Sequence, residues 1–124
     1  MQNKNEIDLA SFVLPSGVID YFTITKVLQT KESLMIYLDE NNLIPKEYIN
    51  DKVISKGFYE ESSIQDFPIR GKAVYLFIRR RRWLNETTGA YICRDWDLVA
   101  KGTRMTQEFA SFLKAIARHQ ANKC

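Results

Sequence analysis

Short stretches of alternating apolar and polar residues dominate the first half of the chain, and a period of two predicts β-strands. Residues 22–30 and 33–38 are rich in β-branched, aromatic and aliphatic side chains, and a polar pair at residues 31–32 separates them. This arrangement predicts a β-hairpin. Residues 52–58 form another candidate strand, which Gly57 is expected to bend.

The longest apolar stretch runs into a row of arginines. Lys72 is followed by six apolar residues, 73–78, which predict a strand, and four arginines and Trp83 follow without a break. If the strand continues, one face carries Tyr75, Phe77, Arg79, Arg81 and Trp83, and the other carries Leu76, Ile78, Arg80, Arg82 and Leu84. Residues 85–89 then predict a hairpin loop, with residues 90–96 as the returning strand. Trp83 and Trp96 are expected in the core.

Helical periodicity is found near the two ends of the chain. Residues 106–120 are expected to form a helix with Thr106 as its N-cap, because apolar side chains recur at helical spacing. These side chains are Phe109, Phe112, Leu113, Ile116 and Ala117. Near the N-terminus, Ser16 is expected to cap a helical turn over residues 17–22. Its inward-facing side chains are expected to be Val18, Ile19 and Phe22.

The remaining segments are expected to connect these elements: residues 44–51 as a short helix or loop, 60–63 as an acidic loop, 70–71 as a turn and 98–104 as a loop. Together the elements predict one α+β domain over residues 1–124. It consists of antiparallel β-hairpins with a short N-terminal helix and an amphipathic C-terminal helix. We divide it into an acidic half (1–67), an arginine-rich β-hairpin (68–104) and the C-terminal helix (106–120).

Charge is distributed unevenly along the chain. Residues 1–67 carry six lysines and eleven acidic residues, a net charge of −5, whereas residues 68–124 carry twelve lysines and arginines and four acidic residues, a net charge of +8. Every arginine lies in the second part. This asymmetry favours one surface for a polyanion and another for a different partner, such as a protein.

The residue types present argue against a zinc site. His119 is the only histidine, and Cys93 and Cys124 are the only cysteines. Four ligands for structural zinc therefore cannot be assembled from cysteine and histidine within one chain, and we expect no metal and no other cofactor. Both cysteines are expected to be reduced thiols.

Three aspartates offer the one candidate for catalysis. Asp66, Asp95 and Asp97 could together hold Mg²⁺, as in a metal-dependent nuclease. The favoured interpretation is an ion pair between Asp95 and the arginine row, since Asp95 directly follows Arg94 and lies opposite that row in the predicted hairpin. We therefore expect no catalytic residue in this chain.

The arginine row points to phosphate binding, because the planar guanidinium fork matches the oxygens of a phosphate. The candidate DNA contacts are Arg79, Arg80, Arg81, Arg82 and Arg94, with Lys72, Lys101 and Arg104 as outer contacts. Alternation along a strand places two of the four consecutive arginines on each face. One pair is expected to face DNA, and the other to bind Asp95, Asp97, Glu60 or Glu61.

Three segments, residues 64–72, 79–83 and 94–109, closely resemble the N-terminal region of a group of bacterial insertion-sequence transposases. The likeness extends over about residues 12–118. That region is similar to the zinc-ribbon head of a wider transposase family, in which a D-x-P-x-x-G turn, here Asp66 to Gly71, leads into a strand that ends in paired arginines. This chain lacks the zinc cysteines, so packing is expected to replace the metal.

The resemblance implies a non-catalytic, DNA-binding part of a transposase that recognises the terminal inverted repeats of the mobile element. A separate RNase H-like domain with an acidic triad would cleave and transfer the DNA. The chain is then expected to be the N-terminal product of a split or frameshifted transposase, and its last helix resembles the first helix of a helix-turn-helix. The expected partners are the terminal repeats, the catalytic transposase chain and, as an open option, a second copy of this chain.

The sequence also predicts a cytoplasmic protein, since it contains neither the apolar core of a signal peptide at its N-terminus nor an apolar run of membrane-spanning length. An alternative function stays open. The chain could be a protein-interaction or regulatory subunit of a transposase complex, in which the arginines form only intramolecular pairs and make no contact with DNA.

Overall fold

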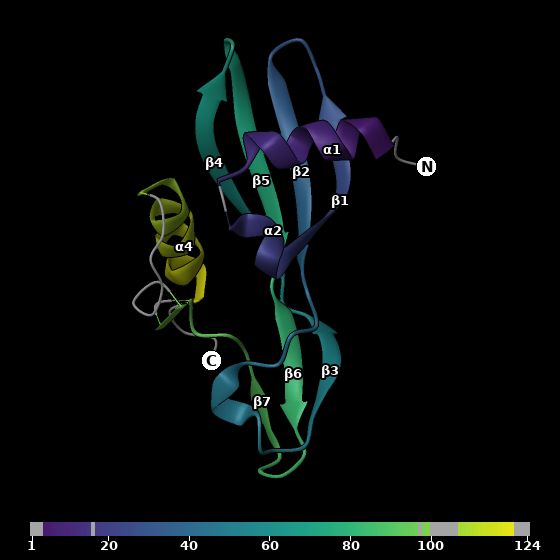
Figure 1. The fold of residues 1–124 in the computed structure, drawn as a ribbon, viewed down its shortest axis with the longest axis vertical. Coiled ribbons are helices and arrows are strands. Elements are labelled where there is room, and N and C mark those ends of the chain that lie inside the picture. Colours follow the sequence, from purple (N-terminus) through teal and green to yellow (C-terminus); the bar gives the residue numbers. More distant parts are fainter. Residues whose placement is uncertain (1–3, 16, 97, 100–106, 121–124) are drawn as a thin grey trace.

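The computed structural model describes residues 4–15, 17–96, 98–99 and 107–120. Its helices are α1 (Lys4–Val13), α2 (Val18–Tyr21), the 3-10 helix η1 (Lys46–Tyr48) and α4 (Gln107–Gln120). Its strands are β1 (Phe22–Gln29), β2 (Ser33–Glu40), β3 (Val53–Phe58), β4 (Ser62–Ile69), β5 (Lys72–Arg79), β6 (Arg81–Asn85) and β7 (Ala90–Ile92). The predicted α+β class is confirmed (Figure 1).

The strands form two sheets, a large one in the order β1-β2-β5-β4 and a small one in the order β3-β6-β7. The predicted hairpins β1–β2 and β6–β7 are confirmed, and β4–β5 forms a third. The returning strand predicted over residues 90–96 is shorter than expected, since β7 ends at Ile92 and Trp96 is helical. The two hairpins of the large sheet lie side by side because β2 and β5 pair in parallel, with Leu38 opposite Ile78. Nothing in the local sequence pattern predicts this pairing, which joins segments far apart in the chain.

The predicted continuous strand through the arginine row is wrong. β5 ends at Arg79, β6 begins at Arg81, and the two strands belong to different sheets. The carbonyl of Arg80 accepts a hydrogen bond from the amide of Tyr59 at 2.8 Å. The buried positions change parity at this point, from even numbers in β5 to Trp83 and Asn85 in β6. The small sheet therefore continues the long axis of the molecule below the large one (Figure 1).

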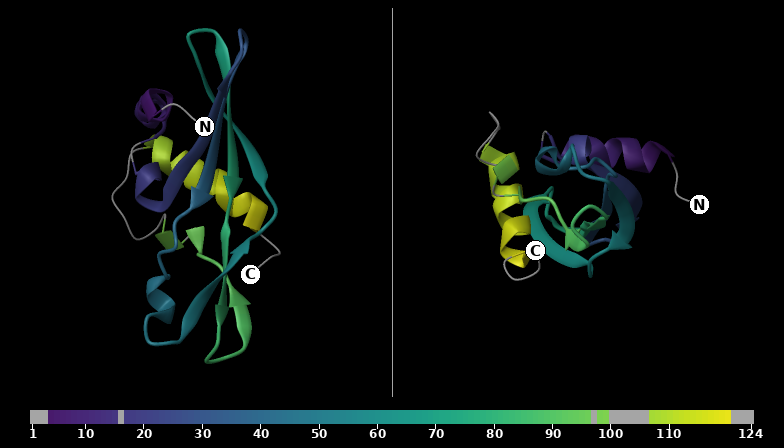
Figure 2. Two further views of the ribbon diagram at one scale, coloured as in Figure 1. Left: turned by 90° about the vertical axis from the view of Figure 1, so that its right-hand side faces the viewer. Right: turned by 90° about the horizontal axis from the view of Figure 1, so that it is seen from below.

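The main core lies on one face of the large sheet, where α1, α2 and α4 cover it. Its strand residues are Phe22, Ile24, Val27, Ile36, Leu38, Val74, Leu76 and Ile78, and its other members include Leu14, Val18, Trp96, Phe109, Phe112, Leu113 and Ile116. Viewed from below, α1 and α4 run along two sides of the strands (Figure 2). Both tryptophans are fully buried, which confirms their prediction as core residues.

Helix α4 confirms the prediction from its apolar spacing. Phe109, Phe112 and Leu113 are buried against the core, whereas the predicted N-cap, Thr106, lies outside the described residues. The helix approaches the N-terminal segment closely at Gly17. A Cβ atom at Gly17 would lie 2.9 Å from the ring of Phe109, so glycine is required for this packing.

Several local predictions need correction. The acidic loop expected at residues 60–63 is only partly a loop, because β4 begins at Ser62. The N-cap of α2 is Gly17 in the left-handed conformation, where Ser16 was the expected cap, and Ser16 lies outside the described residues. Ile19 is exposed, although Val18 and Phe22 are buried as expected. Leu98 and Val99, expected in a loop, are helical.

Two further observations concern the chemistry of the chain. Cys93 is buried and disulfide-bonded, so the expectation of a reduced thiol is wrong for this residue. The only other cysteine in the sequence, Cys124, lies outside the described residues. Among the described helices, none is long and apolar enough to cross a membrane.

Candidate nucleic-acid interface

The four consecutive arginines differ in their hydrogen-bond partners and burial, although Arg79 and Arg81 both contact the ring of Phe58. Arg79 ends β5 opposite Asp39 of β2, in the parallel register of the two strands. Its Nε and one terminal nitrogen donate to the two carboxylate oxygens of Asp39 at 2.7 and 2.5 Å. These hydrogen bonds raise the pKa of Arg79 above its ordinary value. The side chain is still 45% exposed, so one side of the guanidinium faces solvent.

Arg80 is buried in the fold, with only 1% of its surface exposed. Its guanidinium lies 5.2 Å from the centre of the Tyr59 ring, and its nitrogens make no hydrogen bond with a described residue. Burial lowers the pKa of Arg80, and the nearby charge of Glu40 opposes this effect. This arginine cannot reach a ligand on the surface.

The side chain of Arg81 forms hydrogen bonds within the fold. Its Nε donates to the carbonyl of Glu40 at 3.0 Å, and one terminal nitrogen donates to Oγ of Ser55 at 2.6 Å. The guanidiniums of Arg79 and Arg81 lie 4.3 and 4.6 Å from the centre of the Phe58 ring. Cation–π contacts of this kind stabilise both cations, and Arg81 serves mainly to attach β3 to the end of β2.

Arg82 is different because it lies on the open face of the small sheet. Its Nε donates to the carbonyl of Lys56 at 3.1 Å, and its guanidinium lies 5.0 Å from the centre of the Tyr91 ring. Its two terminal nitrogens make no hydrogen bond with a described residue. Tyr91 is 57% exposed, and Lys56 is exposed. We call Lys56, Arg82 and Tyr91 the open-face group.

The pairing of the small sheet explains why Arg82 and Tyr91 share one face. Ile54 of β3, Leu84 of β6 and Tyr91 of β7 lie in register across the three strands. Arg82 is two residues from Leu84, so strand alternation places it on the face of Leu84 and Tyr91. Lys56 lies beside Arg82 in the irregular part of β3 between Ser55 and Phe58, where its carbonyl accepts the hydrogen bond from Arg82. The opposite face carries Trp83, which is buried and donates to Oδ1 of Asn42 at 2.8 Å.

Arg94 is buried among aromatic rings and is paired with Glu40. Its Nε donates to one carboxylate oxygen of Glu40 at 3.2 Å, and a terminal nitrogen donates to the carbonyl of Leu43. The rings of Tyr21, Trp96 and Trp83 lie 5.2, 5.7 and 6.0 Å from its guanidinium. These contacts hold the segment after β7 against the end of β2.

Glu40 is the shared anion of this buried cluster. Its other carboxylate oxygen accepts the amide hydrogen of Arg81 at 3.0 Å. Burial raises the pKa of Glu40 to about 7, although the hydrogen bond from Arg81 and the charges of Arg94 and Arg80 act in the opposite direction. The cluster is therefore a structural junction between the two sheets.

Among the described residues, the hydrogen bonds from the arginines to carboxylates go to Asp39 and Glu40, and not to Asp95, Glu60 or Glu61. The charge of Glu61, one of the predicted partners, nevertheless acts on Arg79 and helps to raise its pKa. Asp95 instead accepts the amide hydrogen of Leu98 at 3.1 Å, as a helix cap does. Asp97 lies outside the described residues. Because the β2–β5 pairing is non-local, the sequence pattern could not identify Asp39 as the partner of Arg79.

Of the predicted outer contacts, Lys72 does not join the arginines. Lys72 lies at the far end of β5, where its Nζ donates to the carbonyl of Thr30 at 2.9 Å. Lys101 and Arg104 lie outside the described residues. Lys56 and Tyr91 were not predicted as site residues, although their positions on candidate strands beside the arginine row could have suggested them.

Two of the three aspartates of the nuclease hypothesis, Asp66 and Asp95, lie in different parts of the fold. Asp66 lies in β4 of the large sheet, and Asp95 follows β7 of the small sheet. In the part of the chain that the structure describes, no three histidine, cysteine or acidic side chains lie close enough together to hold a metal ion.

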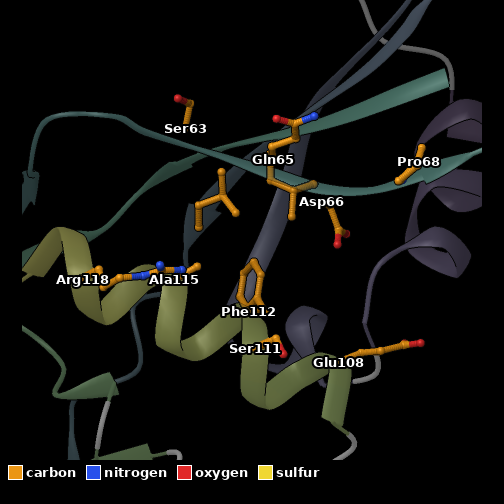
Figure 3. A pocket seen from close by; sticks show the side chains of 11 residues that line it. Ser63, Gln65, Asp66, Pro68, Glu108, Ser111, Phe112, Ala115 and Arg118 are labelled. Atoms are coloured by element: carbon orange, nitrogen blue, oxygen red, sulfur yellow. The ribbon is translucent and has the colours of Figure 1, made fainter.

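A groove of about 710 Å³ lies between β4 and α4 (Figure 3). Leu76 and Phe112 contribute apolar surface, and the charged side chains are of both signs: Asp66 points from β4 toward α4, and Glu108 and Arg118 lie along the helix (Figure 3). Because acidic residues outnumber basic ones in its lining, this groove does not favour a polyanion.

The open-face group thus combines two cations and an exposed aromatic ring on a sheet. Such a surface can bind phosphate through the cations and a base or sugar through the ring. Known proteins add nothing to this description. Comparisons with protein-family models, with curated proteins and with solved structures find no match to the chain.

Proposed function

We propose that this chain is the non-catalytic, DNA-binding N-terminal part of an insertion-sequence transposase, and that it recognises the ends of the element for a separate catalytic domain. The proposal draws on the resemblance of residues 64–72, 79–83 and 94–109 to such proteins, and on the net charge of +8 in the second part of the chain. It places the chain in the cytoplasm, where the element's DNA lies.

The observation that carries the proposal is the open-face group. The two terminal nitrogens of Arg82, which lie beside Lys56, make no hydrogen bond with a described residue, and Tyr91 has an exposed ring next to them. A guanidinium held in place by one backbone hydrogen bond loses little freedom when it binds a phosphate. Arg79 can contribute a further contact from its exposed side, whereas Arg80 and Arg94 are buried and are left out of the interface.

The test is a fluorescence anisotropy titration of the full chain against a duplex that carries the element's terminal repeat. With two or three phosphate contacts, log K should fall against log salt with a slope of about −2 to −3. The double substitution Arg82→Gln and Lys56→Gln should weaken binding and reduce the slope by about 2. Lys46→Gln with Lys114→Gln removes the same charge at exposed positions elsewhere and should leave binding nearly unchanged. Salt-independent or undetectable binding rules the proposal out.

A second candidate is a protein-interaction or regulatory subunit that does not contact DNA. It is favoured by the internal partners of Arg79, Arg81 and Arg94, which give these residues a structural role without any ligand. The same titration separates the candidates. If the chain binds a catalytic transposase chain in a pull-down of purified proteins but does not bind the terminal repeat, the second candidate is correct.

A further inference from the structure

A second hollow, of about 780 Å³, lies at the opposite end of the large sheet from the arginine row. It is bordered by α1 and by the tips of the β1–β2 and β4–β5 hairpins, and Figure 1 shows α1 crossing the sheet below these tips. The two tips are joined because the amide of Ala73 donates to the carbonyl of Glu32 at 2.9 Å and Lys72 donates to Thr30. We call this hollow the hairpin-tip groove.

The floor of the hairpin-tip groove is apolar and its rim is basic. Its apolar lining residues are Ala10, Val13, Val27, Leu28, Leu34 and Ile69. Its charged lining residues within the described part of the chain are Lys31, Arg70 and Lys72, and none of the lining residues described is acidic. Leu28 is 40% exposed, so apolar surface is accessible to a partner at this place.

The cations of the groove come from both parts of the chain. Lys31 belongs to the acidic part, and Arg70 and Lys72 belong to the basic part. Lys31 and Arg70 lie at the two hairpin turns, both side chains are exposed, and neither takes part in an ion pair with a described residue. Arg70 adopts a φ of 50°, which is uncommon for a residue other than glycine.

We infer that the hairpin-tip groove binds an acidic amphipathic segment of a partner protein. Apolar side chains of the segment would cover Val27, Leu28 and Leu34, and its aspartate or glutamate side chains would reach Lys31 and Arg70. Nucleic acid fits this groove less well, because protein–DNA interfaces are polar and phosphates would lie over aliphatic side chains. The inference goes beyond the proposed function and does not depend on it.

The probe for this site is a fluorescein-labelled, 18-residue synthetic peptide with leucine at helical i, i+3, i+4 and i+7 spacing and glutamate elsewhere. Its anisotropy is titrated with the full chain. Matched peptides carry glutamine or lysine in place of glutamate. The glutamate peptide should bind, and the other two should bind at least about tenfold more weakly, because they lack the charge complementary to the rim.

Variants locate the binding. Lys31→Glu with Arg70→Glu should weaken binding of the glutamate peptide about tenfold, since each substitution replaces an attraction by a repulsion. Leu28→Ser should weaken it several-fold through the loss of apolar contact. Lys46→Glu with Lys114→Glu changes the charge equally at exposed sites elsewhere and should have no effect. Circular dichroism checks that each variant is folded, and Lys31→Gln with Arg70→Gln gives a milder second test.

Three results would overturn the inference. The first is no binding of the glutamate peptide. The second is evidence that charge does not matter. This would be equal binding of the glutamate and glutamine peptides, or no loss of binding in the folded Lys31 and Arg70 variants. The third is binding of a single-stranded oligonucleotide or of anionic lipid vesicles that is lost in those variants while the peptide does not bind, because the groove would then serve a different class of partner.

Discussion

Glu40 and Arg94 form a hydrogen-bonded ion pair in the interior, with the Nε of Arg94 3.2 Å from the carboxylate and the two side chains 0% and 10% exposed. This pair connects the end of β2 with the segment after β7. The same carboxylate accepts the amide hydrogen of Arg81 and thereby fixes the start of β6. The junction between the two sheets therefore depends on one acidic side chain.

Glu40→Ala should lower the free energy of unfolding by about 3 kcal/mol, because the buried N–H groups of Arg81 and Arg94 lose their acceptor. Urea denaturation followed by tryptophan fluorescence measures the change. Glu47→Ala, at an exposed position in η1, serves as the control and should change stability by less than about 0.5 kcal/mol. A loss below about 1 kcal/mol for Glu40→Ala would contradict the role assigned to this residue.

The stability of the chain should depend on pH through Glu40. Burial raises the pKa of Glu40 from its ordinary value of 4.5 to about 7. Between pH 4.5 and pH 7, Glu40 is protonated in the folded state and ionised in the unfolded state. The free energy of unfolding therefore falls as the pH rises from 4.5 through 7, by about 3 kcal/mol in total. Glu40→Gln should remove this component, which urea midpoints measured from pH 4.5 to 8 will reveal. The idea fails if the variant keeps the slope of the natural chain.

Arg80→Met should stabilise the protein by about 1 to 3 kcal/mol. Replacement of a buried charge by an apolar side chain of similar length is often favourable, and the nitrogens of Arg80 make no hydrogen bond with a described residue. Affinity for DNA should stay within about twofold, since the side chain is not on the surface. Arg118→Met, at an exposed position, is the control. A large loss of DNA affinity in folded Arg80→Met would show that this arginine has a function that its burial does not reveal.

Gly17→Ala should destabilise the protein more than Gly89→Ala does. Both glycines have a positive φ, at 101° and 81°, so both substitutions strain the backbone, at a cost of about 1 kcal/mol. Only at Gly17 would the new Cβ meet another side chain, the ring of Phe109 at 2.9 Å. The difference between the two variants in thermal unfolding measures the close contact between α4 and the N-terminal segment. Equal losses of stability in the two variants would mean that α4 can move away from residue 17 without a cost in free energy.

The sequence was informative where structure is local. The β1–β2 and β6–β7 hairpins follow from alternation and turn residues, and α4 follows from the spacing of residues such as Phe109 and Leu113. Each of these elements depends on neighbours within a few residues.

The surroundings of the arginines could not be predicted in this way. Asp39 meets Arg79 only because β2 and β5 pair in parallel, and Glu40 meets Arg94 only because the chain changes sheets at Arg80. The sequence at the bend contains no glycine or proline from which the bend could have been predicted. Alternation predicts two arginines on each face. Arg79 and Arg81 do meet at the ring of Phe58, whereas Arg80 is buried and Arg82 lies beside Tyr91.

The change of sheets at Arg80 has a practical consequence for work with fragments. A synthetic peptide that spans residues 68–104 would contain all six arginines of the predicted interface but would lack β2 and β3, which supply Asp39, Glu40 and Ser55. Its guanidiniums would be free to bind any polyanion. Strong binding of nucleic acid by such a peptide would therefore report the chemistry of the excised hairpin, and only the intact chain can reveal which cations the folded protein offers.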